Sequence, residues 1–352
     1  MALRLLACGS QEIPLTTTWH CHLKASTRSV SRQFARLDCV AGGGGRHYNG
    51  RMKLILMGTG TSHGIPVIGC DCAVCHSTDP RDRRFRCSAF LESQNLLVDV
   101  GPEFRLQALK HGIKHLDAVF ITHSHADHLH GIDDLRIFSH TRALDPSHPD
   151  NKETEGQGLP IYTTSAAQRD IEKRFDYIFT PMKEGGGKPK IRILSGEVFS
   201  SESPLVLNGV EVIPVMIKHG ALDDMGLLFC ETTGGQTLGG QRKSIAYLTD
   251  CNYISDAAVD TVRAAAGDLV HLVIDGLRVE PHSTHFCFEQ ALQAAERMKP
   301  RNVYLTHITH NMSHVQIQQY VDSLLPRFPL LQQAKEAGGY VGPAYDAQVL
   351  EC

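Results

Sequence analysis

Short apolar runs that end in turn residues alternate with longer amphipathic segments along most of the chain. The apolar runs predict strands over 53–57, 89–92, 95–100, 117–122, 161–163, 210–217, 226–232, 244–249, 269–274 and 302–306. Apolar residues spaced three and four apart predict helices over 104–111, 165–175, 257–266, 288–299 and 315–325. Strands interleaved with helices predict a layered α/β or α+β fold.

Residues 1–51 lack this regularity and carry seven basic but only two acidic side chains. We interpret them as an N-terminal extension. It is either a disordered tail, or a stretch upstream of a true translation start at Met52, or an organelle-targeting segment. Residues 52–352 are then the folded domain. The net charge of −3 disfavours a general polyanion binder. No apolar run is long enough to span a bilayer, so we expect a soluble protein, cytoplasmic unless the extension targets it.

The densest cluster of metal-binding side chains follows the predicted strand at 117–122. Within six positions stand His123, His125, Asp127 and His128. Imidazole and carboxylate ligands together suit zinc, manganese or iron, whereas calcium prefers oxygen alone. A solvated histidine-rich turn is the alternative, and four such residues within one turn make it the weaker one.

Three other apolar strands also end in a candidate ligand. Asp250 and His307 each follow a predicted strand directly, and His219 lies just past another. Their placement predicts that they converge with the first cluster at one edge of a sheet. Five histidines and two aspartates are enough ligands for two metal ions.

The H-x-H-x-D-H pattern and the three later ligands resemble the metallo-β-lactamase superfamily over about 300 residues from Met52. The resemblance implies an αββα sandwich in which two mixed sheets are flanked by helices. It implies one metal on His123, His125 and His219. A second metal is implied on the remaining ligands, Asp127, His128 and His307, with Asp250 bridging the two ions.

A second cluster, Cys70, Cys72 and Cys75, resembles the loop of the PhnP-type cyclic phosphodiesterases. That resemblance implies a structural zinc on the three cysteines and a distant histidine, for which His310 is the match. Three thiolates at this spacing can surround a tetrahedral ion but need a fourth ligand. His76 competes for that role, although its adjacency to Cys75 makes joint chelation awkward.

His285 occupies the position at which the resemblance implies a general acid that protonates the leaving group. His282, in a nearby His-Ser-Thr sequence, is the alternative, as is a loop histidine without a role. Asp99, near the end of the predicted strand at 95–100, is either an orienting partner of a metal-bound histidine or an ordinary strand-end aspartate. For Arg84, Arg86 and Arg105, surface ion pairs are favoured over phosphate contacts.

The resemblance favours a dinuclear phosphodiesterase for a small cyclic phosphodiester, such as phosphoribosyl cyclic phosphate or a 2′,3′-cyclic nucleotide. Zinc or manganese would fill the active site, and a homodimer is allowed. Possible surface insertions at 142–158 and 183–190 leave the substrate open. The nearest alternative is a tRNA 3′-processing endonuclease, with the lysines of 183–190 as a short RNA arm. A glyoxalase-type thioester hydrolase and a non-catalytic, metal-stabilised interaction protein are the weaker alternatives.

Overall fold

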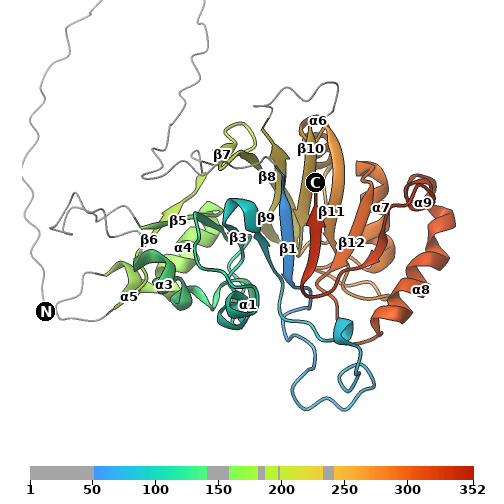
Figure 1. The fold of residues 1–352 in the computed structure, drawn as a ribbon, viewed down its shortest axis with the longest axis horizontal. Coiled ribbons are helices and arrows are strands. Elements are labelled where there is room, and N and C mark those ends of the chain that lie inside the picture. Colours follow the sequence, from blue (N-terminus) through green and yellow to red (C-terminus); the bar gives the residue numbers. More distant parts are fainter. Residues whose placement is uncertain (1–50, 141–157, 181–186, 197–198, 233–241) are drawn as a thin grey trace, which may run out of the picture. The chain divides into compact units, whose positions relative to one another are not determined.

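Two mixed sheets of seven strands each organise the part of the chain that the computed structural model describes, which is residues 51–140, 158–180, 187–196, 199–232 and 242–352 (Figure 1). The first sheet has the order β14 (Gln348–Glu351), β1 (Lys53–Gly58), β2 (Ser88–Leu91), β3 (Leu96–Val98), β4 (Ala118–Phe120), β5 (Leu159–Tyr162) and β6 (Ile191–Leu194). The second has the order β13 (Val341–Pro343), β12 (Asn302–Thr306), β11 (Asp268–Asp275), β10 (Lys243–Leu248), β9 (Leu222–Glu231), β8 (Val210–His219) and β7 (Leu205–Leu207).

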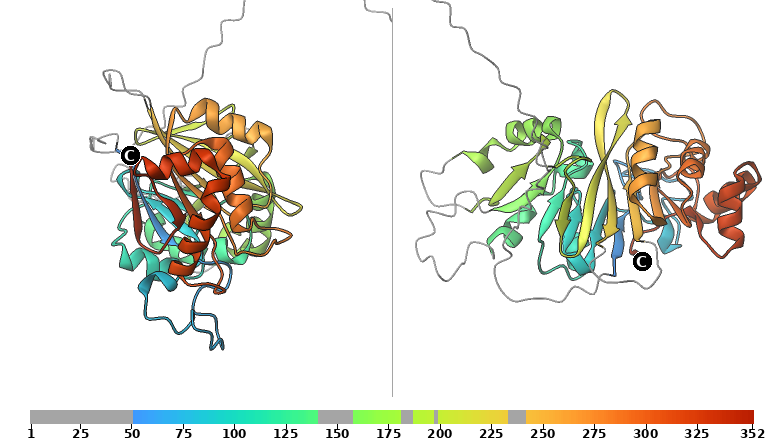
Figure 2. Two further views of the ribbon diagram at one scale, coloured as in Figure 1. Left: turned by 90° about the vertical axis from the view of Figure 1, so that its right-hand side faces the viewer. Right: turned by 90° about the horizontal axis from the view of Figure 1, so that it is seen from above.

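Helices cover the outer face of each sheet, as the views in Figure 2 show. The first sheet is covered by α1 (Phe104–Lys110), α3 (Arg136–His140), α4 (Ser165–Arg174) and α5 (Asp176–Phe179). The second is covered by α6 (Asp256–Ala265), α7 (Phe288–Met298), α8 (His314–Leu324) and α9 (Pro329–Glu336). The αββα sandwich implied by the sequence is therefore confirmed.

Alternation along the strands explains the layers. In β1, Leu54 and Leu56 face the space between the sheets, while Ile55 and Met57 face the helices. Because successive side chains of a strand point to opposite faces, a strand that is apolar throughout is buried on both sides. Three hydrophobic clusters result, one between the sheets and one under each helical layer.

Each of the ten strands and five helices predicted from the pattern is present, and all but the strand at 302–306 have a shifted end. The predicted hairpin is the antiparallel pair β2 and β3. Strands β6, β7, β13 and β14 were missed because they have three or four residues and are partly exposed or contain Gly and Pro. Helices α2 (Ala126–Leu129), α3 and α5 are too short to show a helical period, and α9 was also missed.

The connections bring several strand ends to one edge of the sandwich. Strands β3, β4 and β5 are parallel neighbours in the first sheet, as are β10, β11 and β12 in the second. Strand β8 runs in the direction of β10, because β9 between them is antiparallel to both. The carboxyl ends of these strands carry most of the predicted site residues.

Among the described residues, no helix has the length and apolar character needed to cross a membrane. The extension at 1–51, apart from Arg51, lies outside the described residues, as does 142–158 except for Gly158. Of 183–190, only 187–190 is described.

Candidate dinuclear metal centre

The turn after β4 presents the first candidate ligands. His123 and His125 leave the strand end in an extended backbone, and Asp127 and His128 lie on the single turn of α2. His123, His125 and His219, the last residue of β8, each offer a ligand atom within 4.8 Å of the others. These three are the residues assigned to the first metal from the sequence.

A second group consists of Asp127, His128, Asp250 and His307, whose ligand atoms also lie within 4.8 Å of one another. The two groups meet at Asp250. Its Oδ2 atom lies 3.2 Å from His128 Nε2, 3.3 Å from His307 Nε2 and 3.8 Å from His123 Nε2. One carboxylate oxygen thus faces histidines of both groups, which is the placement expected of a bridging ligand.

The unpaired nitrogens of this cluster fit metal binding. Nε2 of His123, His128 and His307 is buried and has no hydrogen-bond partner among the described residues. Buried polar atoms are nearly always hydrogen-bonded, so three unpaired nitrogens around one carboxylate require a missing partner. Their sp² lone pairs and the carboxylates suit zinc or manganese. The donor set therefore fits two divalent metals, one on each group with Asp250 between them.

Strained backbone supports two of these ligands. Asp250 has φ of 51° and His307 has φ of 60°, and Asp99, at the end of β3, has φ of 59°. The left-handed region costs a non-glycine residue free energy, and such residues persist where the surrounding structure holds them. Asp99 and His307 follow a strand directly and Asp250 lies two residues after the end of β10, so the strain turns their side chains toward the shared edge of the sheets.

Polar contacts to the Nδ1 atoms orient several of the candidate histidine ligands. Asp99 Oδ2 lies 2.7 Å from His128 Nδ1, which is the orienting contact considered for it from the sequence. His219 Nδ1 lies 2.7 Å from the carbonyl oxygen of Thr284. Thr122 Oγ1 lies 3.0 Å from His123 Nδ1, and the buried Asp224 of β9 adds an ion-pair contact, with Oδ2 at 3.3 Å from the same nitrogen. Such partners fix the tautomer and the direction of a metal-binding imidazole.

Asp224 was missed from the sequence because it lies near the start of β9 rather than at the end of an apolar strand. Its position opposite Ile217 of β8 brings it to the same edge as His219. Only the hairpin pairing of β8 and β9 carries that information.

His285 stands beside the cluster with an aspartate of its own. Its Nδ1 atom lies 2.6 Å from Asp275 Oδ2, and its ring stacks on that of His307 with centroids 4.4 Å apart. The alternative His282 is exposed and hydrogen-bonds locally to Thr284. Asp275 was missed from the sequence. A signal for it was available, since Asp275 ends an apolar strand.

The electrostatics of the cluster attract cations. Burial by itself raises the pKa of Asp250, but His128 and His307 hold it well below its ordinary value. Burial also lowers the pKa of His128, whereas Asp250 and Asp99 together raise it well above the ordinary value. The Asp250 carboxylate therefore remains charged at neutral pH, and its negative charge favours a divalent cation. Burial, followed by His307, lowers the pKa of His285 to about 4.

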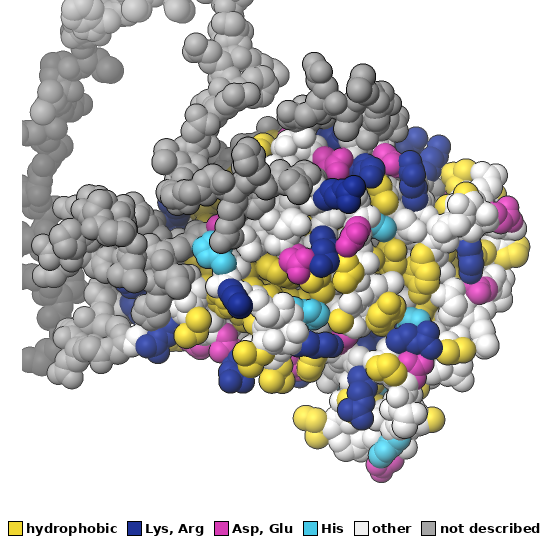
Figure 3. Space-filling view, in the orientation of Figure 1, with side chains coloured by type: hydrophobic (Ala, Val, Ile, Leu, Met, Phe, Trp, Pro, Cys, Tyr) yellow, Lys and Arg dark blue, Asp and Glu magenta, His cyan; other side chains and the backbone are white. Residues whose placement is uncertain are grey.

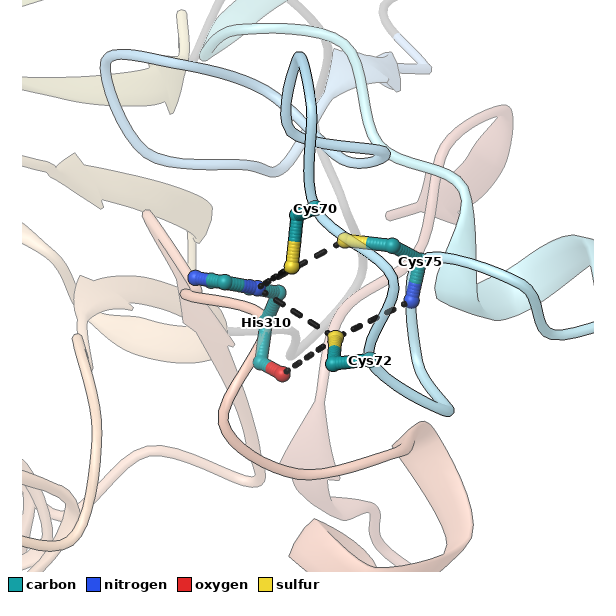
Figure 4. Close-up of side chains that lie close together, drawn as sticks. All are labelled: Cys70, Cys72, Cys75 and His310. Carbon is teal, nitrogen blue, oxygen red and sulfur yellow. Dashed lines mark hydrogen bonds between the residues drawn. The ribbon is translucent and has the colours of Figure 1, made fainter.

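The three cysteines and His310 form a separate group (Figure 4). His310 Nδ1 lies 3.4 Å from the sulfurs of Cys70 and Cys72 and 3.5 Å from that of Cys75. A tetrahedral zinc with bonds of about 2.3 Å to sulfur and about 2.0 Å to nitrogen requires such an edge to be roughly 3.5 Å. The group therefore fits one structural zinc. His76 points elsewhere and pairs with Asp71 at 3.3 Å.

The expectation of a surface ion pair was wrong for Arg84, which is 3% exposed. Its guanidinium donates to Thr59 Oγ1 at 2.7 Å and to the Ala344 carbonyl at 2.5 Å. Arg86 pairs with Glu103, as expected, and Arg105 is exposed. On the face drawn in Figure 3, basic side chains are interleaved with acidic ones rather than gathered into a patch.

Comparisons with known proteins agree with this geometry. The family model described as "Beta-lactamase superfamily domain" matches residues 94–308. A crystal structure of a diphosphatase from the PhnP family is 31% identical, with a TM-score of 0.64, and the match covers 86% of this chain and 97% of that one. Zinc-bound PqqB from Methylobacterium extorquens is 17% identical with a TM-score of 0.56 over 85% and 99% of the two chains, which shows the fold alone.

A curated octanoyltransferase of Porphyromonas gingivalis is 30% identical over 279 residues. The match includes 78% of this chain and 49% of that protein, so the chain spans about half the length of this relative. The same family is indicated by the family match, by the similarity to the diphosphatase and by the two ligand groups. The chain belongs to the beta-lactamase superfamily and is similar to a PhnP-family diphosphatase.

Proposed function

We propose that the protein is a dinuclear, metal-dependent phosphodiesterase that hydrolyses a small cyclic phosphodiester of the phosphoribosyl cyclic phosphate or 2′,3′-cyclic nucleotide type. The observation that carries the proposal is the position of Asp250 Oδ2, within 3.8 Å of three imidazole nitrogens from both ligand groups. The Cys₃His group, shared in pattern with the PhnP-type enzymes, narrows the substrate class.

Two divalent metals at this cluster would supply an activated water and neutralise the phosphoryl oxygens. The chain's own contribution is proton transfer and orientation. His285 is the proposed acid. Its pKa of about 4 leaves the free ring neutral, but an anionic substrate would raise that pKa, and the imidazolium would then give its Nε2 proton to the leaving alkoxide. Asp275 accepts the hydrogen bond of His285 Nδ1, which leaves Nε2 turned away from Asp275. Asp99 and Asp224 hold the rings of His128 and His123.

The test is turnover of 2′,3′-cyclic AMP, bis-p-nitrophenyl phosphate and a pre-tRNA after reconstitution with Mn²⁺ or Zn²⁺. The metal content is counted on the same samples, and Asp250→Ala protein prepared in parallel controls for contaminating enzymes. Cleavage of the cyclic diester, with about three metals per chain, supports the proposal. Turnover of the RNA alone contradicts it and favours the processing nuclease.

A diphosphate bond is the second candidate substrate, because the 31% identical relative is called a diphosphatase. Its cleavage leaves a phosphate, which is a far better leaving group than an alkoxide. A dinucleoside diphosphate added to the assay separates the candidates: loss of His285 should slow the cyclic diester much more than the diphosphate.

Two described features favour a small substrate over structured RNA. Basic side chains are dispersed on the face of Figure 3. Lys188, a candidate for an RNA arm, instead donates to the Thr180 carbonyl at 2.5 Å, at the end of α5. We do not extend octanoyl transfer to this chain, because the match covers about half of that protein. In the proposal, catalysis requires neither a nucleic acid nor a membrane as partner. The protein works in a cytosol-like compartment and is free to form a homodimer.

A further inference from the structure

Helix α4 places a pair of opposite charges against the turn that carries the first two candidate ligands. Asp170 and Arg174 are one helical turn apart, with Arg174 Nη2 at 3.5 Å from Asp170 Oδ2. Ser124, which separates His123 from His125, donates its hydroxyl to the same carboxylate oxygen at 2.6 Å. Arg174 Nη1 donates to the carbonyl oxygen of Ser124. One helix thus binds both the side chain and the backbone of Ser124.

The helix itself is firmly placed. Its Thr164 cap accepts a hydrogen bond from the backbone N–H of Ala167, and Ala167 and Ile171 are buried against the first sheet. Positions 167, 170, 171 and 174 lie three and four residues apart, so they share one face of the helix. The charged pair therefore extends the buried face and reaches the turn from an anchored element.

His125 is the candidate ligand that needs such support. The rings of His123, His128 and His219 each have a polar partner behind them. The ring of His125 makes no hydrogen bond within the described residues. Its neighbours are the rings of His123 and His219, with centroids 4.5 Å and 5.0 Å away. The direction of its side chain is consequently set by the backbone of the preceding peptide.

We propose that Asp170 and Arg174 are positioning residues that hold the peptide between Ser124 and His125, and so fix His125 for metal binding. The guanidinium fixes the carbonyl and the carboxylate fixes the hydroxyl, so the peptide plane cannot rotate freely. The inference rests on the proposed function only in taking His125 as a metal ligand. Both charged side chains are about half exposed, so water replaces part of each contact when one is removed. We therefore expect metal affinity to fall about tenfold, which is the low end of the range for residues that support a metal ligand.

The experiment uses the full chain loaded with Co²⁺ and titrated with a chelator. Thiolate-to-cobalt absorption reports the Cys₃His group, and the weaker visible bands report the histidine and aspartate cluster. The variants are Arg174→Ala, Arg174→Lys and Asp170→Asn. Arg169→Ala is the matched control, because Arg169 lies exposed on the same helix. Thermal unfolding is measured for each.

We expect Arg174→Ala to release cobalt from the cluster at about tenfold lower chelator concentration, with the cysteine signal and the Arg169→Ala control unchanged. Arg174→Lys, which keeps a cationic donor, should recover part of the loss. If Arg174→Ala and Asp170→Asn both keep the parent affinity, the positioning role is wrong. Should Arg174→Ala fail to fold, Asp170→Asn decides alone, because it keeps the size of the side chain. A parent protein that binds cobalt yet cleaves no phosphodiester refutes the proposed function but leaves this comparison valid.

Discussion

At the residue scale, the bridging position of Asp250 has the largest expected consequence. Its Oδ2 atom is the common neighbour of three imidazole nitrogens in a cluster that is almost fully buried. Removing the carboxylate leaves those nitrogens without the negative charge that balances two cations. Deletion of a central ligand therefore affects both metals rather than one.

We expect Asp250→Ala to lose the two cluster metals and at least about 10³-fold in kcat, while the cysteine-bound metal stays. Metal analysis and steady-state kinetics on one preparation measure both. A variant that keeps all its metals and its rate would show that Asp250 does not bridge them.

The pair formed by His285 and Asp275 carries a different expectation, because neither residue is a proposed metal ligand. His285→Ala should reduce kcat by about 10²–10⁴-fold on substrates with poor leaving groups, with the metal content unchanged. Asp275→Asn should have a smaller effect in the same direction, since it disturbs only the tautomer of His285. Equal rates of parent and His285→Ala protein on a poor leaving group would remove the general-acid assignment.

At the element scale, the loop between β1 and β2 joins the cysteine group to the cluster. His307 and His310 lie three residues apart, and the segment between them is tied to the start of this loop. Ile308 N donates to the Thr59 carbonyl at 3.0 Å, and Thr61 N donates to the Ile308 carbonyl at 3.1 Å. A zinc on the cysteines therefore stiffens the backbone that holds His307 in its left-handed conformation.

Cys72→Ser is expected to lose the structural metal and to weaken metal binding at the cluster by roughly tenfold. Chelator titration measures the second effect. Cys352→Ser is the control, because that thiol lies outside both groups and near Ser244. Unchanged cluster affinity in Cys72→Ser would mean that the two sites are independent.

His314, at the start of α8, makes the free energy of unfolding depend on pH. Burial and then Arg84 lower the pKa of His314 to about 4, against about 6.5 in an unfolded chain. The unfolded state therefore binds more protons between these values, so the contribution is complete above pH 6.5 and is lost as the pH falls toward 4. At about 1.4 kcal/mol per pKa unit, the loss is of order 1–3 kcal/mol.

His314→Gln should flatten this part of the pH profile. The measurement is the difference in the free energy of unfolding between variant and parent, taken in denaturant at pH 4.5 and pH 7. His130→Gln, at an exposed site, is the control. A difference that is the same at both pH values would contradict the assignment.

At the scale of the whole molecule, the cluster joins the two sheets. The first sheet supplies His123, His125 and, through α2, Asp127 and His128, whereas the second supplies His219, Asp250 and His307. Metals bound there would connect the layers, and binding free energy would add to the stability of the fold.

Removal of all metals should therefore lower the midpoint of thermal unfolding. At a free metal concentration of about 1,000 times the Kd, one site contributes about 4 kcal/mol, or roughly 6 °C for a domain of about 300 residues. Calorimetry with and without chelator measures the shift. The double variant Cys72→Ser, Asp250→Ala should show almost none, and a parent protein with the same midpoint in chelator would contradict the coupling.

The layered fold, the seven candidate ligands and the cysteine group could all be predicted from the sequence. These signals are local, because an apolar run that ends in His or Asp predicts both a strand and a candidate ligand at its carboxyl end. The contacts made by Asp224, Asp275, Asp170 and Arg174, and the burial of Arg84, are visible only in the three-dimensional structure. Each acts through a residue at least ten positions away, across a strand pairing or a helix contact. A polar residue of this kind has no periodicity of its own, and its meaning depends on the atom that folding places opposite it.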